Sequence, residues 1–201
     1  MVTNASDEAL YQILTIGYAG FQVESFISIL HQFGVPMIVD IRTAPYSRVH
    51  PDFCKNKLKR ILDESGIAYV YLGRSLGGKY TDPAVQFPEG GVSYARVATL
   101  PTFMNGLAEL IQISQDNPRC TLLCVERDPC QCHRFTLVSH ELSKIGVSVG
   151  HIQGDGTIRS NRDLEEGLQK RYGIYIALET LYEMHNHSLF KIETHQHNIS
   201  E

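Results

Sequence analysis

The middle of the chain has the sequence Cys120-Thr-Leu-Leu-Cys-Val-Glu-Arg-Asp-Pro-Cys-Gln-Cys-His-Arg134. Its first six residues, 120–125, are mostly apolar and have the length of a buried strand. The polar residues 126–129 end this run with a proline, and residues 132–145 have the spacing of a helix. The segment therefore predicts a strand, a polar turn and a helix in succession.

The same unit recurs along the chain. Strands are expected at 13–16, 35–41, 67–72, 120–125 and 147–152, and helices at 21–33, 52–65, 94–115 with a break at Pro101, and 132–145. Alternation of strands and helices favours a parallel sheet covered on both faces. The expected fold class is α/β, a three-layer sandwich with a mostly parallel central sheet of about five strands, helices on both faces and a C-terminal helical extension.

The length of 201 residues and the hydrophobic content of 43% suit one domain. We expect a single α/β domain over 11–152, with a long loop at 73–92, rich in glycine and proline, that covers a site. Residues 153–201 are expected to be an extension with helices near 163–172 and 175–184. Its His-rich end contains His185, His187, His195 and His197, to which we assign no function.

Composition excludes some classes of protein. The net charge of −4 provides no general attraction to nucleic acid or to an anionic membrane, so nucleic-acid binding would need a local basic patch. No apolar run approaches the roughly 20 residues that span a bilayer, and the N-terminus lacks a signal sequence, which predicts a cytoplasmic protein without a membrane partner. In a reducing compartment, clustered cysteines are more often ligands or reactive groups than disulfides. Cys54 and Cys120 stand apart and are expected to be packing residues.

Polar residues follow each predicted strand, at the edge where open parallel sheets bind ligands. They are Gly17 and Tyr18 at the carboxyl end of the first strand, Asp40, Arg42, Ser47 and Arg48 at that of the second, Arg74 at the third, Cys124, Glu126 and Arg127 at the fourth, and His151 at the fifth. We therefore expect one site at this edge.

Seven short motifs carry a resemblance to a known family. They are Thr15-Ile-Gly-Tyr18, Asp40-Ile-Arg42, Pro45-Tyr-Ser-Arg48, Leu76-Gly-Gly78, Cys124-Val-Glu126, Cys132-His-Arg134 and His151-Ile152. Together they resemble the uncharacterised bacterial and archaeal family known as domain of unknown function 488. Tyr18 stands where many relatives have His, which weakens any mechanism that needs an imidazole there. The resemblance implies no activity, because none is assigned to the family.

The strand-end cysteine and glutamate form a candidate catalytic pair. Cys124 and Glu126 are two residues apart, so their side chains lie on the same side of an extended strand. The alternative is a packing thiol and a surface carboxylate paired with Arg127. Asp40 could serve as a general base or orient Arg42. The residues alone leave these roles open.

Cys132 and His133 are expected at the start of a helix. Unpaired N–H groups there lower a cysteine pKa, and Arg127 and Arg134 would add to the effect. The same N–H groups bind phosphate or carboxylate, and His133 could instead cap the helix. We take His133 as a catalytic candidate.

Five arginines are predicted at the same edge of an acidic chain, which favours an anionic ligand. The candidate substrate-binding residues are Gly17, Tyr18, Arg42, Ser47, Arg48, Arg74, Arg127, Arg134 and His151. The candidate catalytic residues are Cys124, Glu126, Asp40 and His133.

Zinc or iron is an open alternative, because Cys124, Cys130, Cys132, His133 and His151 could supply ligands. The Cys-x5-Cys-x-Cys-His spacing differs from the Cys-x2-Cys pairs of common zinc modules, and two adjacent residues on one helix can hardly face one ion. No metal ligand is therefore assigned.

Other reaction classes lack their motifs. A tyrosine-phosphatase loop needs an arginine six residues after its cysteine, but Cys130 and Thr136 occupy these positions after Cys124 and Cys130. No Gly-x-Gly-x-x-Gly or phosphate-binding lysine motif is present. We favour an enzyme, a hydrolase or transferase with a reactive cysteine, that acts on a small phosphorylated or nucleotide-like anion. The alternatives are a metal-binding structural or sensory protein and a nucleic-acid-associated module; the sequence leaves the oligomeric state open.

Overall fold

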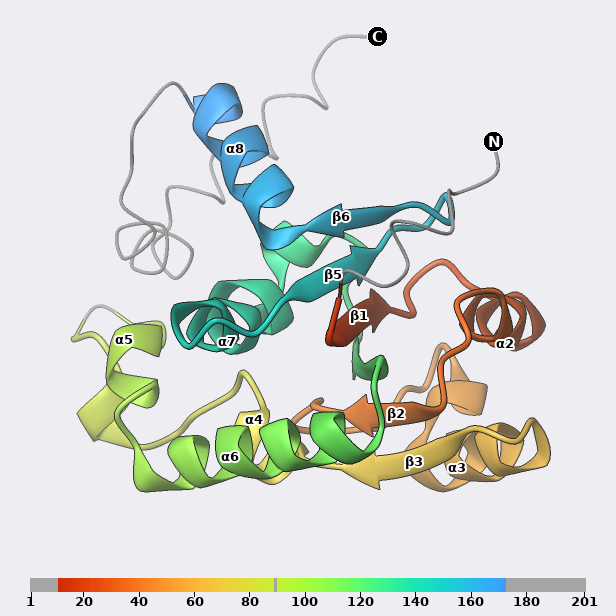
Figure 1. Ribbon diagram of the computed structural model, residues 1–201. Coiled ribbons are helices and arrows are strands. Elements are labelled where there is room, and N and C mark those ends of the chain that lie inside the picture. Colours follow the sequence, from red (N-terminus) through yellow and green to blue (C-terminus); the bar gives the residue numbers. More distant parts are fainter. Residues whose placement is uncertain (1–10, 89, 173–201) are drawn as a thin grey trace, which may run out of the picture.

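Six strands form one mostly parallel sheet. In the computed structural model, which describes residues 11–88 and 90–172, the strand order is β3-β2-β4-β1-β5-β6 (Figure 1). The strands are β1 (Ile13–Gly17), β2 (Met37–Asp40), β3 (Ala68–Tyr71), β4 (Cys120–Cys124), β5 (Val149–Ile152) and β6 (Ile158–Ser160). The first five pair in parallel, and β6 is antiparallel to β5. The predicted α/β class with a mostly parallel sheet is confirmed, with one strand more than expected.

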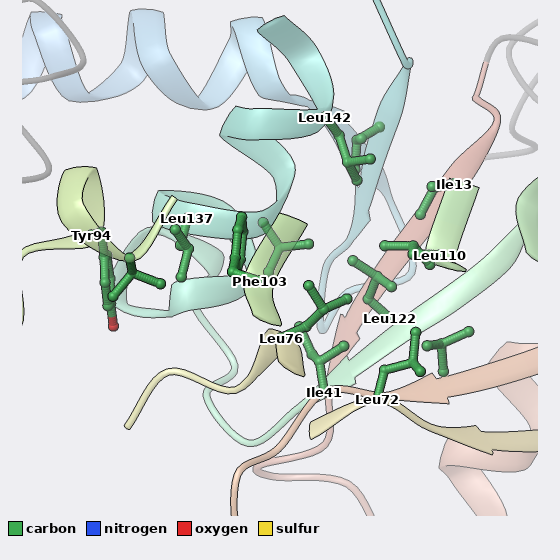
Figure 2. Packing of buried hydrophobic residues seen from close by; sticks show 14 of the residues in the cluster. Ile13, Ile41, Leu72, Leu76, Tyr94, Phe103, Leu110, Leu122, Leu137 and Leu142 are labelled. Atoms are coloured by element: carbon green, nitrogen blue, oxygen red, sulfur yellow. The ribbon is translucent and has the colours of Figure 1, made fainter. Parts of the chain in front are cut away.

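Helices cover both faces of the sheet. On one face, α2 (Val23–Gln32) and α3 (Lys55–Glu64) bury Phe26, Leu30, Leu58 and Leu62 against the strands. On the other face lie α6 (Pro101–Asp116), the π-helical segment η4 (Arg134–Ser139) and α7 (His140–Lys144). Figure 2 shows Phe103 and Leu110 of α6 packed with Leu122, Leu137 and Leu142 in this second core. The three layers are those of the predicted sandwich.

Short helices interrupt the segment that was expected to be a long loop. They are α4 (Gly73–Leu76) and the 3₁₀ turn η2 (Pro83–Val85), followed by α5 (Tyr94–Val97). A bridge between Gln86 and Val92 closes the intervening turn. The segment 73–92 is therefore partly ordered by local hydrogen bonds, although glycine and proline separate its pieces.

Two predicted helices begin later than expected, each because one cysteine has an extended backbone. Cys54 separates the 3₁₀ turn η1 (Pro51–Phe53) from α3, and its Sγ lies 3.3 Å from the carbonyl oxygen of Ser47. Cys132 separates the 3₁₀ turn η3 (Pro129–Gln131) from η4, with φ −137° and ψ 138°. The break expected at Pro101 separates α5 from α6.

The sheet continues beyond residue 152. A turn at 153–157 leads into β6, and the charged helix α8 (Asn161–Tyr172) follows, burying Leu164. The sequence pattern missed β6 because the strand is short and flanked by polar residues. The helix expected near 175–184 and the four tail histidines lie outside the described residues. Within the described part of the chain, no helix combines the length and the apolar character needed to cross a bilayer.

The two central strands lead to opposite faces of the sheet. β1 continues into α2 on one face, whereas its neighbour β4 continues into η4 and α7 on the other. Gly17 at the end of β1 pairs with Cys124 at the end of β4. Ligands of open α/β sheets bind at this kind of switch point, outside the carboxyl ends of the strands.

Candidate site at the carboxyl ends of the central strands

Two thiols, an imidazole and a carboxylate converge at this switch point. Cys124 Sγ lies 3.2 Å from Glu126 Oε2 and 3.7 Å from His133 Nδ1, and Cys132 Sγ lies 3.9 Å from the same nitrogen. The two sulfur atoms and this nitrogen are all within 4.8 Å of one another. We call Cys124, Glu126, Cys132 and His133 the thiol cluster.

The backbone at Cys132 brings two adjacent side chains to the same point. Cys132 is extended, whereas His133 has α-helical dihedral angles of −57° and −20°. The side chains of neighbouring residues diverge along a regular helix, but here the chain changes conformation between them. The expectation that Cys132 and His133 can hardly face one ion is therefore wrong, because they do not share a helix.

His133 is held from two sides. Its Nε2 lies 3.2 Å from the carbonyl oxygen of Ile41, which can only accept, so Nε2 carries a hydrogen and Nδ1 is the nitrogen facing the sulfurs. The backbone of Gly78 covers the ring so closely that a Cβ atom would lie 2.6 Å from His133 Cγ. Tyr94 donates a 3.5 Å hydrogen bond to the Gly78 carbonyl oxygen, and its labelled ring borders the core in Figure 2. The segment 73–92 thus forms one wall of the cluster.

Arg134 is a buried residue that holds the turn next to the cluster through hydrogen bonds. Its guanidinium donates to the carbonyl oxygens of Glu126 and, at 3.0 Å, Arg127, while its backbone N–H donates to Cys132 Sγ at 3.4 Å. The side chain is fully buried. Its position therefore orders the turn between Cys124 and Cys132 and places a positive charge near the thiols.

The protonation equilibria in the cluster are coupled. Burial opposes ionisation of Cys132, yet the hydrogen bond from Cys124 and the charge of Arg134 lower the pKa of Cys132 well below its ordinary value. The same hydrogen bond, together with burial, raises the pKa of Cys124. Burial lowers the pKa of His133, but its interaction with Cys132 outweighs this and raises it. Desolvation, followed by the neighbouring Cys132, raises the pKa of Glu126. Cys132 is consequently the preferred thiolate.

Asp40 and Arg42 form a separate buried pair. Asp40 accepts hydrogen bonds from Arg42 Nε at 2.8 Å, Arg42 Nη2 at 2.6 Å and the Tyr69 hydroxyl at 2.7 Å. Arg42 Nη1 donates to the carbonyl oxygen of Phe53 at 2.8 Å. Of the two roles considered for Asp40, this geometry favours the orientation of Arg42.

Tyr18 packs over the same pair. Its ring stacks on Phe53 with 4.2 Å between centroids, and the Arg42 guanidinium carbon lies 5.2 Å from the Tyr18 centroid. Tyr18 and Arg42 are both buried. In the structure these two predicted substrate-binding residues stabilise the loop after β2. Their direct contact with a substrate stays a prediction.

His151 belongs to another buried network. Its Nδ1 lies 2.8 Å from Thr15 Oγ1 and its Nε2 lies 2.5 Å from Asn161 Oδ1. Burial lowers the pKa of His151 to about 3. Since β5 lies on the far side of β1 from β4, this imidazole connects β1 to the start of α8 and lies outside the thiol cluster.

The remaining candidates lie in the segments that follow the strands. Arg48, Arg74 and Arg127 are exposed, and Arg127 lies so close to Gly154 that a Cβ atom on that glycine would meet its guanidinium. Ser47 is half-buried, and its hydroxyl accepts a 2.9 Å hydrogen bond from the His50 backbone.

Gly17 packs directly against the turn that follows β4. A Cβ atom on this residue would overlap the carbonyl oxygen of Glu126 and lie 2.8 Å from Arg134 Nη1. A glycine is therefore required for the turn after β4 to cross the end of β1.

Sequence reasoning left three contributors out of the candidate list. Cys132 was considered for its pKa but not assigned a role, Gly78 was noted within Leu76-Gly-Gly78, and Tyr94 had no local signal. The sequence signal for Cys132 was its place beside His133. Tyr94 lies near the site because the segment between β3 and α6 folds back so that its hydroxyl reaches the Gly78 carbonyl oxygen. Local sequence periodicity does not reveal such a contact.

A family model matches residues 22–140, more than half of the chain. The chain belongs to the family described as domain of unknown function DUF488. The DUF488 match includes the thiol cluster, Asp40, Arg42 and Gly78, and it leaves Gly17, Tyr18 and His151 outside. No curated protein and no solved structure matches the chain. The predicted resemblance is confirmed, and with it comes no assigned activity.

Proposed function

We propose that this DUF488 protein is an enzyme that transforms a small anionic substrate at the carboxyl edge of its sheet. The observation that carries the proposal is the convergence of four side chains: Cys124 lies within hydrogen-bonding reach of Glu126 and His133, and Cys132 lies within reach of His133. A core gains nothing from such a concentration of polar groups, whereas catalysis needs them together.

The cluster contains the groups required for hydrolysis or group transfer. Thiols can act as nucleophiles or metal ligands, and a carboxylate or imidazole can move a proton. Glu126 is exposed at the rim, and Cys124 and Cys132 lie beneath it. This arrangement lets a substrate approach the carboxylate first while the sulfur atoms stay protected from solvent.

Three exposed arginines support an anionic substrate. Arg48, Arg74 and Arg127 follow β2, β3 and β4 respectively, so we expect all three at the edge that carries the cluster. A guanidinium presents several donors in a plane and suits phosphate or carboxylate. Because the chain as a whole is acidic, we expect this attraction to be local and to favour a phosphorylated or nucleotide-like molecule.

Turnover assays on phosphate monoesters, phosphodiesters and nucleotides test the proposal. Cys124→Ser and Glu126→Gln should each reduce kcat/KM by about 100-fold or more, and Glu126→Gln should leave the unfolding midpoint close to that of the wild type. Cys130→Ser is the matched control, because Cys130 lies in the same turn but outside the cluster. Full activity of both cluster variants would contradict the proposal.

A separate binding measurement tests the proposal that the site binds an anion. Calorimetric titration with inorganic pyrophosphate should show binding that weakens in Arg127→Ala without a change in the unfolding midpoint. Equal pyrophosphate binding by the wild type and this variant would remove Arg127 from the site.

A further inference from the structure

We infer that Cys124, Cys132 and His133 bind one zinc ion, with a fourth position open to water or substrate. This inference concerns the same site as the proposed function and rests on it for its catalytic meaning. It stands, however, on the geometry of three ligand atoms, which is measurable without any knowledge of the reaction.

The spacing of the ligand atoms suits a tetrahedral metal. Zinc lies about 2.3 Å from a thiolate and about 2.0–2.1 Å from an imidazole nitrogen, so a tetrahedral ion separates sulfur from nitrogen by about 3.6 Å. Cys124 Sγ and Cys132 Sγ lie 3.7 and 3.9 Å from His133 Nδ1. The third separation, between the sulfur atoms, is at most 4.8 Å, compared with about 3.8 Å for the ideal arrangement. Movements of about 1 Å or less would therefore complete the site.

The imidazole is already oriented as a ligand. The hydrogen on His133 Nε2 points to the Ile41 carbonyl oxygen, which directs the lone pair of the neutral ring, on Nδ1, toward the two sulfurs. A metal-ligating histidine commonly donates its other N–H to a backbone carbonyl in this way. Gly78 packs on the ring face and restricts its rotation.

The surroundings also suit bound thiolates. The backbone N–H of Arg134 donates to Cys132 Sγ, and the Arg134 guanidinium is anchored within the turn that joins the two cysteines. Donors and positive charge of this kind stabilise sulfur ligands and hold them in place. The buried sulfurs are shielded from solvent on the side of the core.

The donor set identifies the class of metal. Two thiolates and an imidazole favour zinc over magnesium or calcium, which prefer oxygen ligands. Structural zinc sites have four protein ligands, whereas catalytic sites have three and keep one position for water. Glu126, whose carboxylate contacts Cys124 Sγ from the rim, would be the group that accepts a proton from a water at the open position.

Metal analysis of the freshly purified full-length protein is the first test. We expect about one equivalent of zinc, which a chelator removes and added zinc alone restores under reducing conditions. Replacement by cobalt should produce sulfur-to-cobalt charge-transfer absorption and the intense visible bands of a tetrahedral ion. Less than about 0.1 equivalent in the purified protein, together with no uptake of added zinc, would overturn the inference, as would iron in place of zinc.

Single variants assign the ligands. Cys124→Ser, Cys132→Ser and His133→Gln should each weaken zinc binding by more than about 100-fold. Substitution of a residue that only hydrogen-bonds to a ligand typically weakens metal binding by about 10–100-fold. Cys130→Ser and Glu126→Gln should retain one equivalent. Wild-type affinity in all three ligand variants, or an equal loss in Cys130→Ser, would overturn the assignment. If a ligand variant does not fold, the cobalt spectrum of the wild type still decides whether thiolates bind the metal.

The inference and the proposed function can fail separately. Activity that survives complete removal of the metal but is lost in Cys124→Ser would overturn the catalytic role of the zinc and leave a thiol enzyme. One tightly bound zinc without turnover of any phosphate ester or nucleotide would support the metal site and contradict the proposed enzyme.

Discussion

The pH dependence of stability should reveal His151 as a buried neutral side chain. Asn161 Oδ1 accepts the hydrogen on His151 Nε2, because the Asn161 amide nitrogen is committed to the Ser139 carbonyl oxygen at 3.0 Å. Nδ1 then accepts from the Thr15 hydroxyl at 2.8 Å. Both ring nitrogens are satisfied in the neutral form, so a second proton would have to break the bond with Thr15.

The sign and size of the effect follow from the two pKa values. Burial, opposed in part by the hydrogen bond to Asn161, lowers the pKa of folded His151 to about 3 from an ordinary 6.5. As pH falls, the unfolded chain takes up a proton first, so the contribution is complete above pH 6.5 and is lost between 6.5 and about 3. At about 1.36 kcal/mol for each pKa unit, the total loss is about 5 kcal/mol, of which about 2 kcal/mol has gone by pH 5.

Urea denaturation at pH 7 and pH 5 measures this loss. The free energy of unfolding of the wild type should fall between these pH values by about 2 kcal/mol more than that of His151→Gln, which has no titrating ring. The comparison cancels other titrating groups, including His140, whose pKa burial lowers to about 4. The same pH dependence in both proteins, or an NMR titration of the folded His151 ring near pH 6.5, would refute the reasoning.

Two further substitutions test the packing that supports the site. Gly17→Ala should lower the free energy of unfolding by about 1–3 kcal/mol, because the added Cβ atom would overlap the Glu126 carbonyl oxygen. Urea denaturation measures this change. A decrease of less than about 0.5 kcal/mol would contradict the close crossing of the turn after β4 over the end of β1. Arg42→Leu should lower the free energy of unfolding by about 3–5 kcal/mol, because it leaves the Asp40 carboxylate buried without its ion pair. Arg48→Ala, at an exposed position, is the control and should change the free energy of unfolding by less than about 0.5 kcal/mol. Equal effects of the two substitutions would show that the buried pair does not contribute to stability.

Much of the fold was predictable because its signals are local. The runs at 13–16 and 120–125 are too short for helices and end at glycine or polar residues, and the observed β1 and β4 follow them closely. Pro101 lies where α6 begins, since a proline is accommodated in the first turn of a helix. β6 was missed because three residues bearing one apolar side chain do not form a recognisable pattern.

The candidate site was predictable in place but not in composition. The carboxyl edge follows from the parallel sheet, and Cys124, Glu126 and His133 lie together there. Arg42 follows β2 and His151 lies within β5, but their buried partners are Asp40 and Asn161, and neither joins the thiol cluster. A position in the sequence after a strand indicates the edge and does not reveal the partner of a side chain.

The amino-acid sequence by itself determined the alternation of strands and helices and the presence of thiols, imidazole and carboxylate after the fourth strand. Tertiary structure decided which of these groups meet. The insertion of β4 between β1 and β2 brings Gly17 opposite Cys124, and the extended backbone at Cys132 turns two adjacent residues toward one point. Periodicity arises from each residue's neighbours along the chain, whereas strand order depends on contacts between distant segments, and an extended backbone at a single residue leaves no periodic pattern.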